Sequence, residues 1–315
     1  AHAVYLSQYQ LLPYKRIEEY FSDQLDIPIS AGSLFNFNKQ AFDLVSSSGA
    51  QEAIKQALRS SQSALHADET GINVAGKRWW LHCASDQAWT YFTSNKKRGK
   101  DAMDDAGILA DFQGVLCHDH WKPYYQYTDC EHALCNAHHL RELERAWEQD
   151  NMAWAKAMKA LLVDINQTQR NNGFIVDQTT QTRYRLSYQK ILADGDVDCP
   201  PPDEKTRKKG QRGRLKRTKS RALLERLRKF EDDVLRFMTR VDIPFTNNQG
   251  ENDIRMTKVH QKISGCFRSE QGAEMFCLIR SYLSSCRKQD VTASEALNLL
   301  FRNQLPDIFL METAE

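Results

Sequence analysis

Apolar positions recur along this chain at two spacings, and the change from one to the other divides it into regions. From residue 4 to residue 45, and again from 50 to 63, they follow the spacing of one helix face. A turn at Ile27–Gly32 separates two helices in the first stretch, and Ser33 is a suitable N-cap for the second. The pair indicates either a helix-turn-helix that binds DNA or a structural helical pair.

Between residues 64 and 94 the spacing shortens to that of strands. Three runs rich in Val, Ile, Thr and aromatic residues are separated by turn signals at Gly71, at 75–77 and at 85–86. These runs predict an antiparallel meander of strands at 64–70, 72–84 and 88–94. Further elements follow in the order helix (99–112), strand (114–120), short strand (near 132–135) and helix (137–149). This order predicts an α/β fold in which helices flank a mixed sheet.

The remainder of the chain has helical periodicity. The expected helices cover residues 151–170, 180–193, 221–240, 247–260, 271–288 and 292–302. No internal repeat accompanies them. The C-terminal half is therefore predicted to be all helical.

Composition narrows the class of protein. The 315 residues are 41% hydrophobic, which is enough for one large domain or two to three smaller ones. No apolar run is long enough to span a bilayer, and the first residues lack a signal-peptide pattern. Eight scattered cysteines are typical of buried thiols in a reducing compartment, so we expect a bacterial cytoplasmic protein. The chain opens without Met inside an amphipathic segment, which indicates a trimmed polypeptide.

Positive charge is concentrated in one segment, although the net charge is only +2. Residues 205–221 read KTRKKGQRGRLKRTKSR and contain no acid. Such a block is typical of a solvated linker or loop, and it is also the electrostatic footprint of contact with a phosphate backbone. The second interpretation predicts that Lys208, Lys209, Arg212 and Arg214 bind DNA without reading its sequence.

Three carboxylates stand out by their positions. Asp68 and Asp119 are placed at the ends of two predicted strands, and strand ends gather at one rim of a sheet. Glu251 lies near the start of a helix opened by Asn247 or Asn248. Carboxylate oxygens are the ligands that Mg²⁺ prefers. Two such ions support an in-line displacement at phosphorus.

Several motifs together resemble the transposases of the insertion sequence 66 family. The matching residues are Asp68-Glu69-Thr70 with the hairpin NVAGKRWWL, Arg98-Gly99-Lys100, Asp119 in GVLCHDHWKPYY, Cys135 to His138 in CNAHHLRELE, Asn247, Asn248, Glu251 and Arg255, and SEQGAE at 269–274. Three positions depart from the family pattern. His120 replaces the usual Gly, Asn136 an aromatic, and Asn252 an Arg.

The resemblance implies an RNase H-like catalytic domain with a DDE triad that cleaves and transfers DNA strands. It implies two Mg²⁺ or Mn²⁺ ions on Asp68, Asp119 and Glu251, a supporting or structural role for Glu69, and a hydrogen bond from His138 to the scissile phosphate. If the helix of Glu251 lies along DNA, Arg255 and Lys258 would also face phosphate, with Lys262 and Arg268 as further candidates; Arg255 and Lys258 could equally form an ordinary solvated face paired with acids. The resemblance also implies that the partners are DNA of the transposon ends and of the target, and accessory proteins of the same element. It further implies a homo-oligomer and a location at the bacterial nucleoid.

The long span between the second and third acids implies an insertion. We therefore expect a helical segment at 1–60, the first part of the RNase H-like core at 61–150, a helical insertion at 151–243 with the basic loop 203–221, and C-terminal helices at 244–315 that complete the core.

Alternatives remain open at this stage. Cys130, Cys135, His138 and His139 could form a zinc site, although their spacing is not that of a regular finger. A non-catalytic DNA-binding or accessory protein could keep the same fold. A ribonuclease H-like nuclease would use the same three acids on an RNA–DNA hybrid.

Overall fold

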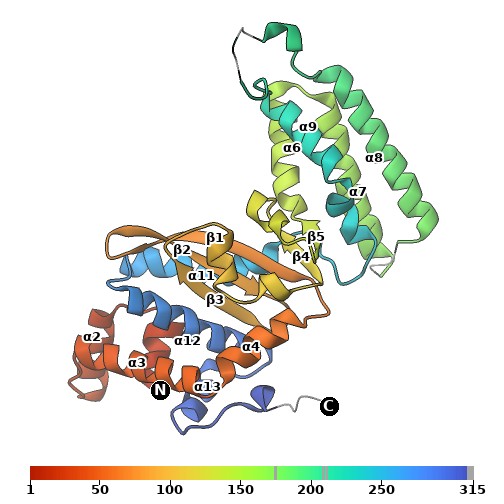
Figure 1. The fold of residues 1–315 in the computed structure, drawn as a ribbon. Coiled ribbons are helices and arrows are strands. Elements are labelled where there is room, and N and C mark those ends of the chain that lie inside the picture. The colour runs from red at the N-terminus through yellow and green to blue at the C-terminus, as the bar shows by residue number, and fades with distance from the viewer. Residues whose placement is uncertain (174–175, 208–209, 211, 311–315) are drawn as a thin grey trace. The chain divides into compact units, whose positions relative to one another are not determined.

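The computed structural model describes residues 1–173, 176–207, 210 and 212–310 (Figure 1). Its elements form two compact units. The first unit comprises Ala1–Leu116, Trp121–Glu131 and Asn248–Glu315, and the second comprises Cys117–His120 and His132–Asn247. Each unit is therefore assembled from segments that are distant in the sequence.

A five-stranded sheet with the order β3-β2-β1-β4-β5 organises the fold. Its strands are β1 (Leu65–Val74), β2 (Lys77–Ser85), β3 (Thr90–Asn95), β4 (Val115–His118) and β5 (Glu131–Leu134). β1 pairs with β2, and β2 with β3, in antiparallel register. The predicted meander is confirmed, as is the α/β class with a mixed sheet flanked by helices.

Helices cover both faces of the sheet in the first unit. The helices of the first unit are α1 (His2–Val4), α2 (Tyr14–Leu25), α3 (Ala31–Ser47), α4 (Ala50–Arg59), α5 (Lys100–Asp104), α11 (Asn248–Ser264), α12 (Glu270–Lys288) and α13 (Ala293–Leu300). One apolar cluster joins α4 and α5 to the sheet, and another joins α11 and α12 to it. In Figure 1, α11 and α12 run along the meander in blue.

The two faces of β1 carry different chemistry. Successive side chains of a strand point to opposite faces, so Ala67 and Glu69 share one face while Asp68 and Ile72 share the other. Ala67 packs in the cluster with α4 and α5. Ile72 packs in the cluster that contains Ile254 of α11. The two neighbouring acids therefore face different layers of helices.

Side chains of α12 bind the edge strand β3. The Ser281 hydroxyl accepts a hydrogen bond from the Phe92 N–H (2.8 Å), and the Ser285 hydroxyl accepts one from the Thr90 N–H (3.1 Å). Both serines are fully buried. β3 is an edge strand of the described sheet, so no neighbouring strand accepts from these two N–H groups. The serine hydroxyls of α12 accept from them instead.

Apart from residues of β4 and β5, the regular secondary structure described in the second unit is helical. Its helices are α6 (Asn136–Asp150), α7 (Ala153–Asn171), α8 (Gln178–Asp198), α9 (Lys219–Lys229) and α10 (Glu231–Leu235). Close packing of α8 requires Gly195, where a Cβ would lie 2.7 Å from a Leu224 methyl and 3.0 Å from the Trp154 ring. Among the helices that the structure describes, none has the length and apolar character to cross a bilayer.

One predicted turn is wrong, and it changes the place of a candidate site residue. β1 continues through Gly71, which is paired with Trp80. The glycine makes room for Arg78, whose Cζ would lie 2.4 Å from an added Cβ. Asp68 therefore lies inside β1 and not at its end. The turn predicted at 75–77 is present, with positive φ at Ala75 and Gly76.

Other boundaries also differ from the prediction. The N-cap of α3 is Ser30, whose hydroxyl accepts from the Ser33 N–H, so the assignment of Ser33 is wrong. The helix expected at 99–112 ends early because Gly107 adopts a positive φ of 67°. The helix expected at 221–240 breaks at Phe230, which leaves the helical region with φ −117° and ψ 32°.

Candidate active site

Glu69 forms a buried charged cluster with two partners from later in the chain. Its carboxylate is 2% exposed and accepts hydrogen bonds from the Arg98 guanidinium (2.5 and 3.1 Å) and from the Tyr124 hydroxyl (2.6 Å). The guanidinium also lies over the rings of Trp80 (4.6 Å) and Trp121 (4.2 Å). Arg98 thereby ties the loop after β3 to β1. The motif GVLCHDHWKPYY contains Trp121 and Tyr124, but sequence reasoning did not connect either residue with Glu69 or Arg98.

Asp68 is half-buried on the opposite face of β1. Its Oδ1 accepts a hydrogen bond from the Glu69 N–H (2.9 Å), and its backbone is in register with Cys83 of β2. Because strand pairing on one side and the Glu69 cluster on the next residue fix the backbone, the Asp68 carboxylate is held in a defined direction. That direction is toward the layer that contains α11.

Two hydrogen bonds fix how α11 runs along the meander. Near its C-terminal end, the Gln261 amide donates to the Gly71 carbonyl (3.1 Å). Near its N-terminal end, the Gln249 amide donates to the carbonyl of Asp86. Asp86 directly follows β2, whose last residue is in register with His66 of β1. The helix therefore runs parallel to β1.

Glu251 lies in the first turn of this helix, at the end of the contact where Asp68 is found. The twelve residues between the two anchoring glutamines rise about 18 Å in a helix. The five residues of β1 from 66 to 71 cover about 17 Å. Glu251 is about 3 Å along the helix from its first anchor. Asp68 is about 7 Å along the strand from the corresponding end. Both carboxylates thus belong to the same half of the α11–β1 contact.

Asp119 directly follows β4, which is the neighbour of β1 in the sheet order, and it belongs to the second unit. The preceding His118 is fully buried. Its Nδ1 accepts from the His120 N–H (3.1 Å), and its Nε2 lies 3.1 Å from Nδ1 of His132. Burial lowers the pKa of His118 well below its usual value. A neutral ring that accepts at Nδ1 carries its proton on Nε2, so His118 donates to His132.

His120 occupies a backbone conformation that suits the glycine of the family pattern. Its φ is +74°, in the left-handed region where a Cβ is unfavourable. The ring packs edge-on against Phe230 at 4.6 Å. The departure from the family pattern therefore keeps the turn after Asp119 and adds a ring contact.

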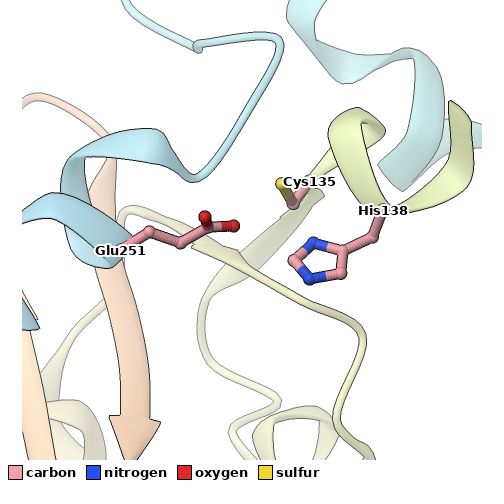
Figure 2. Close-up of side chains that lie close together, drawn as sticks. All are labelled: Cys135, His138 and Glu251. Atoms are coloured by element: carbon pink, nitrogen blue, oxygen red, sulfur yellow. The ribbon is translucent and has the colours of Figure 1, made fainter. Parts of the chain in front are cut away.

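The start of α6 carries the Cys-x-x-His motif (Figure 2). Cys135 is the N-cap residue of α6, is 1% exposed, and accepts a hydrogen bond at Sγ from the Asn247 N–H (3.1 Å). His138 lies in the first turn. Asn247 directly precedes α11, the helix that carries Glu251. The thiol therefore holds the residue from which α11 starts.

The other residues of the zinc alternative make local contacts. The Cys130 thiol lies 3.5 Å from the Tyr127 carbonyl, and His139 Nδ1 lies 3.0 Å from Oδ1 of Asn136. His139 is buried, which lowers its pKa well below the usual value and keeps the ring neutral. Zinc binding by this set stays a prediction.

The cations predicted to bind DNA on α11 are exposed. Arg255, Lys258 and Lys262 are spaced to share one face, and Arg268 follows the helix. Across the part of the chain that the structure describes, no ion pair involves these four residues. Arg221 of α9, by contrast, is paired with Asp196 and Glu225. We call the four cations the α11 row.

The basic segment 203–221 is described only in part. Lys208 and Lys209 lie outside the described residues. Arg212 and Arg214 are exposed. DNA contact by these four residues stays a prediction.

Comparison with known proteins identifies one family. The model of the family described as Transposase IS66 family matches residues 1–275. The matched range contains Asp68, Asp119 and Glu251 as well as α11. No match is found among the curated proteins.

Proposed function

Because the chain belongs to the IS66 family of transposases, which are DNA-processing enzymes, we propose that it cleaves and transfers DNA strands with a triad of Asp68, Asp119 and Glu251. Water would attack the phosphate at the end of the element in the first step. The freed 3′-hydroxyl would attack a target phosphate in the second.

One observation carries this proposal. α11 runs parallel to β1 on the face that Asp68 shares, with Glu251 in its first turn. Asp119 directly follows the neighbouring strand β4. Strand pairing, a helix anchored at both ends and a histidine-bonded turn are rigid supports for a site. They favour Asp68 and Glu251 as a preorganised pair of carboxylates within the first unit, to which Asp119 would add the third.

The donor set fits a hard divalent cation. Three carboxylates suit Mg²⁺ or Mn²⁺, while the motif residues Cys135 and His138 offer sulfur and nitrogen. Two bound ions would activate the attacking oxygen and stabilise the leaving oxygen. The chain's own residues would position the phosphate, with His138 donating a hydrogen bond to it.

DNA would lie along the α11 row. Within the described structure these cations have no acidic partner, so they can bind DNA phosphates without breaking an ion pair of the protein. Their binding releases counterions from the DNA. Arg255, one turn after Glu251, would contact the phosphate nearest the reaction. Paired ends would require two copies of the chain, and accessory proteins of the element are further expected partners.

Cleavage of DNA that carries the element's ends tests this proposal. In the presence of Mg²⁺, Asp119→Ala should reduce nicking more than about 100-fold, the upper end of the effect of losing a supporting group around a metal. Binding to the same DNA should be unchanged. Asp129→Ala, which removes an exposed acid ten residues later, is the matched control.

The outcomes separate the alternatives. Equal nicking by the wild-type protein and Asp119→Ala would refute the catalytic triad. Tight binding without nicking by any variant would favour an accessory DNA-binding protein. Preferential cleavage of an RNA–DNA hybrid would favour a ribonuclease.

A further inference from the structure

The first unit contains a cavity that the proposed chemistry does not use. Its volume is about 330 Å³. It lies between the N-terminal segment around Gln8 and Tyr14, α3, the end of α11 and the segment that leads into α12. This size is at the lower end of the range for small-ligand sites. None of the three proposed catalytic carboxylates lines it.

Two polar atoms in the wall lack hydrogen-bond partners. Gln8 is 8% exposed, and its Oε1 has no partner in the described structure. The same holds for Nδ1 of His260. A buried polar atom without a partner destabilises the fold by about 1–3 kcal/mol. Both atoms would be satisfied by a ligand that carries a donor and an acceptor.

His260 is a neutral hydrogen-bonding group. Burial lowers its pKa to about 4, and the positive charge of Arg280 acts in the same direction. The ring stacks on Phe267 with centroids 4.6 Å apart and an interplanar angle of 14°. A neutral imidazole offers one donor and one acceptor in a fixed plane.

The cavity attracts anions. Lys15 and Arg268 line it and are exposed, and no lining residue carries a carboxylate. Behind the wall, the buried Arg280 donates to the carbonyls of Gln8 and Tyr9. A negative group at the mouth would therefore meet positive charge from two sides.

Aromatic side chains complete the lining. Tyr14 and Phe35 are half-buried, so part of each ring faces the cavity. The Tyr14 hydroxyl oxygen accepts a hydrogen bond from the Asn38 amide (2.8 Å), which fixes the ring. Flat apolar walls suit a flat ligand, because every nucleobase has a π-face that stacks on aromatic rings.

We propose that this cavity binds a nucleobase together with its phosphate. The base packs against Tyr14 and Phe35, its edge bonds to Gln8 and His260, and Arg268 holds the phosphate. The choice of ligand rests on the proposed function in DNA processing. Arg268 is also the last cation of the α11 row, so a nucleotide unstacked from DNA on that row can reach the cavity. Unstacking costs a few kcal/mol, which the buried contacts offset.

Binding of the four 2′-deoxynucleoside 5′-monophosphates, measured by calorimetry in EDTA, tests the proposal. The wild-type protein should bind at least one of them. Gln8→Leu and Arg268→Gln should each weaken that binding by about tenfold, the effect of one buried or charged hydrogen bond. Arg16→Gln removes an exposed cation next to Lys15 that does not line the cavity, and it should leave the affinity unchanged.

A second probe identifies the source of the nucleotide. A DNA hairpin with an unpaired 2-aminopurine should change its fluorescence on binding, and Gln8→Leu should abolish the change. That result assigns the cavity to DNA. Monophosphate binding without the fluorescence change assigns it to a free nucleotide.

No binding of any monophosphate and no fluorescence change would overturn the proposal, as would wild-type affinity in both Gln8→Leu and Arg268→Gln. Arg268→Gln keeps the test valid if Gln8→Leu fails to fold, since Arg268 is exposed. EDTA and the use of Asp119→Ala as a parallel sample separate this result from the outcome of the cleavage assay.

Discussion

Replacing Arg98 by Met isolates the contribution of the Glu69 cluster. The change leaves a carboxylate that is 2% exposed without its cation, while the Tyr124 hydroxyl remains. Removing one partner of a buried ion pair typically destabilises by about 3–5 kcal/mol. Arg98 itself is 39% exposed, so water reaches part of the pair and we expect the lower end, about 3 kcal/mol.

The adjacent lysine provides the matched control. Lys97 pairs with Asp101 at 2.9 Å, but the two side chains are 70% and 75% exposed. Lys97→Met therefore removes an ion pair of similar length from the same loop in full contact with water. Its unfolding curve should coincide with that of the wild-type protein.

Urea unfolding followed by far-ultraviolet circular dichroism measures these differences. Fluorescence is unsuitable, because Arg98 lies over Trp80 and Trp121 and its loss changes their emission. Adding Glu69→Gln to Arg98→Met removes the uncompensated charge and should restore part of the lost stability. If Arg98→Met and Lys97→Met unfold at the same urea concentration, the reasoning about burial is refuted.

Further predictions concern the hairpin, acid stability and DNA affinity. Ala75→Asn should stabilise the protein by about 0.5–1 kcal/mol in thermal unfolding, because Ala75 adopts φ 49° at a two-residue turn that favours Asn-Gly. Burial lowers the pKa values of His82 and His260 to about 4 in the folded protein. As the pH falls, both side chains are therefore protonated in the unfolded chain before they are protonated in the folded protein. The stability that both contribute should be complete above pH 6.5 and lost as the pH falls toward 4, and His82→Gln should reduce that loss of melting temperature. Lys258→Gln and Lys262→Gln should each lower the slope of log affinity for DNA against log salt by about 0.9, whereas unchanged slopes would exclude DNA from the α11 row.

Periodicity predicted most of the helices and strands but not which of their residues contact one another. The meander and its turn at Ala75–Gly76 follow from the two-residue alternation and the local turn signal. The turn predicted at Gly71 is wrong because glycine is found both in turns and where another side chain lies close to the backbone. Only the pairing with β2 identifies Arg78 as that side chain. The break at Phe230 was not predictable, since the apolar spacing continues across it.

The candidate site depends on contacts across long separations in the chain. Family motifs pointed to Asp68 and Glu251, whereas residue spacing alone supplied no reason to join them. The Cys135–Asn247 hydrogen bond spans 112 residues, and the Glu69–Arg98 bond spans 29. Local propensity contains no information about such pairs, because it describes only neighbours within a few residues. The family resemblance identified the motifs, and the structure adds the hydrogen bonds between their residues.

The serine contacts of α12 impose an order on biosynthesis. Phe92 and Ser281 are 189 residues apart, and Thr90 and Ser285 are 195 apart. At typical translation rates, about ten to forty seconds pass between the emergence of strand and helix from the ribosome. During that interval the nascent β3 can pair with strands of other chains. Chains terminated before α12 should therefore aggregate, and the edge of the sheet at β3 should be covered only after α12 has been made.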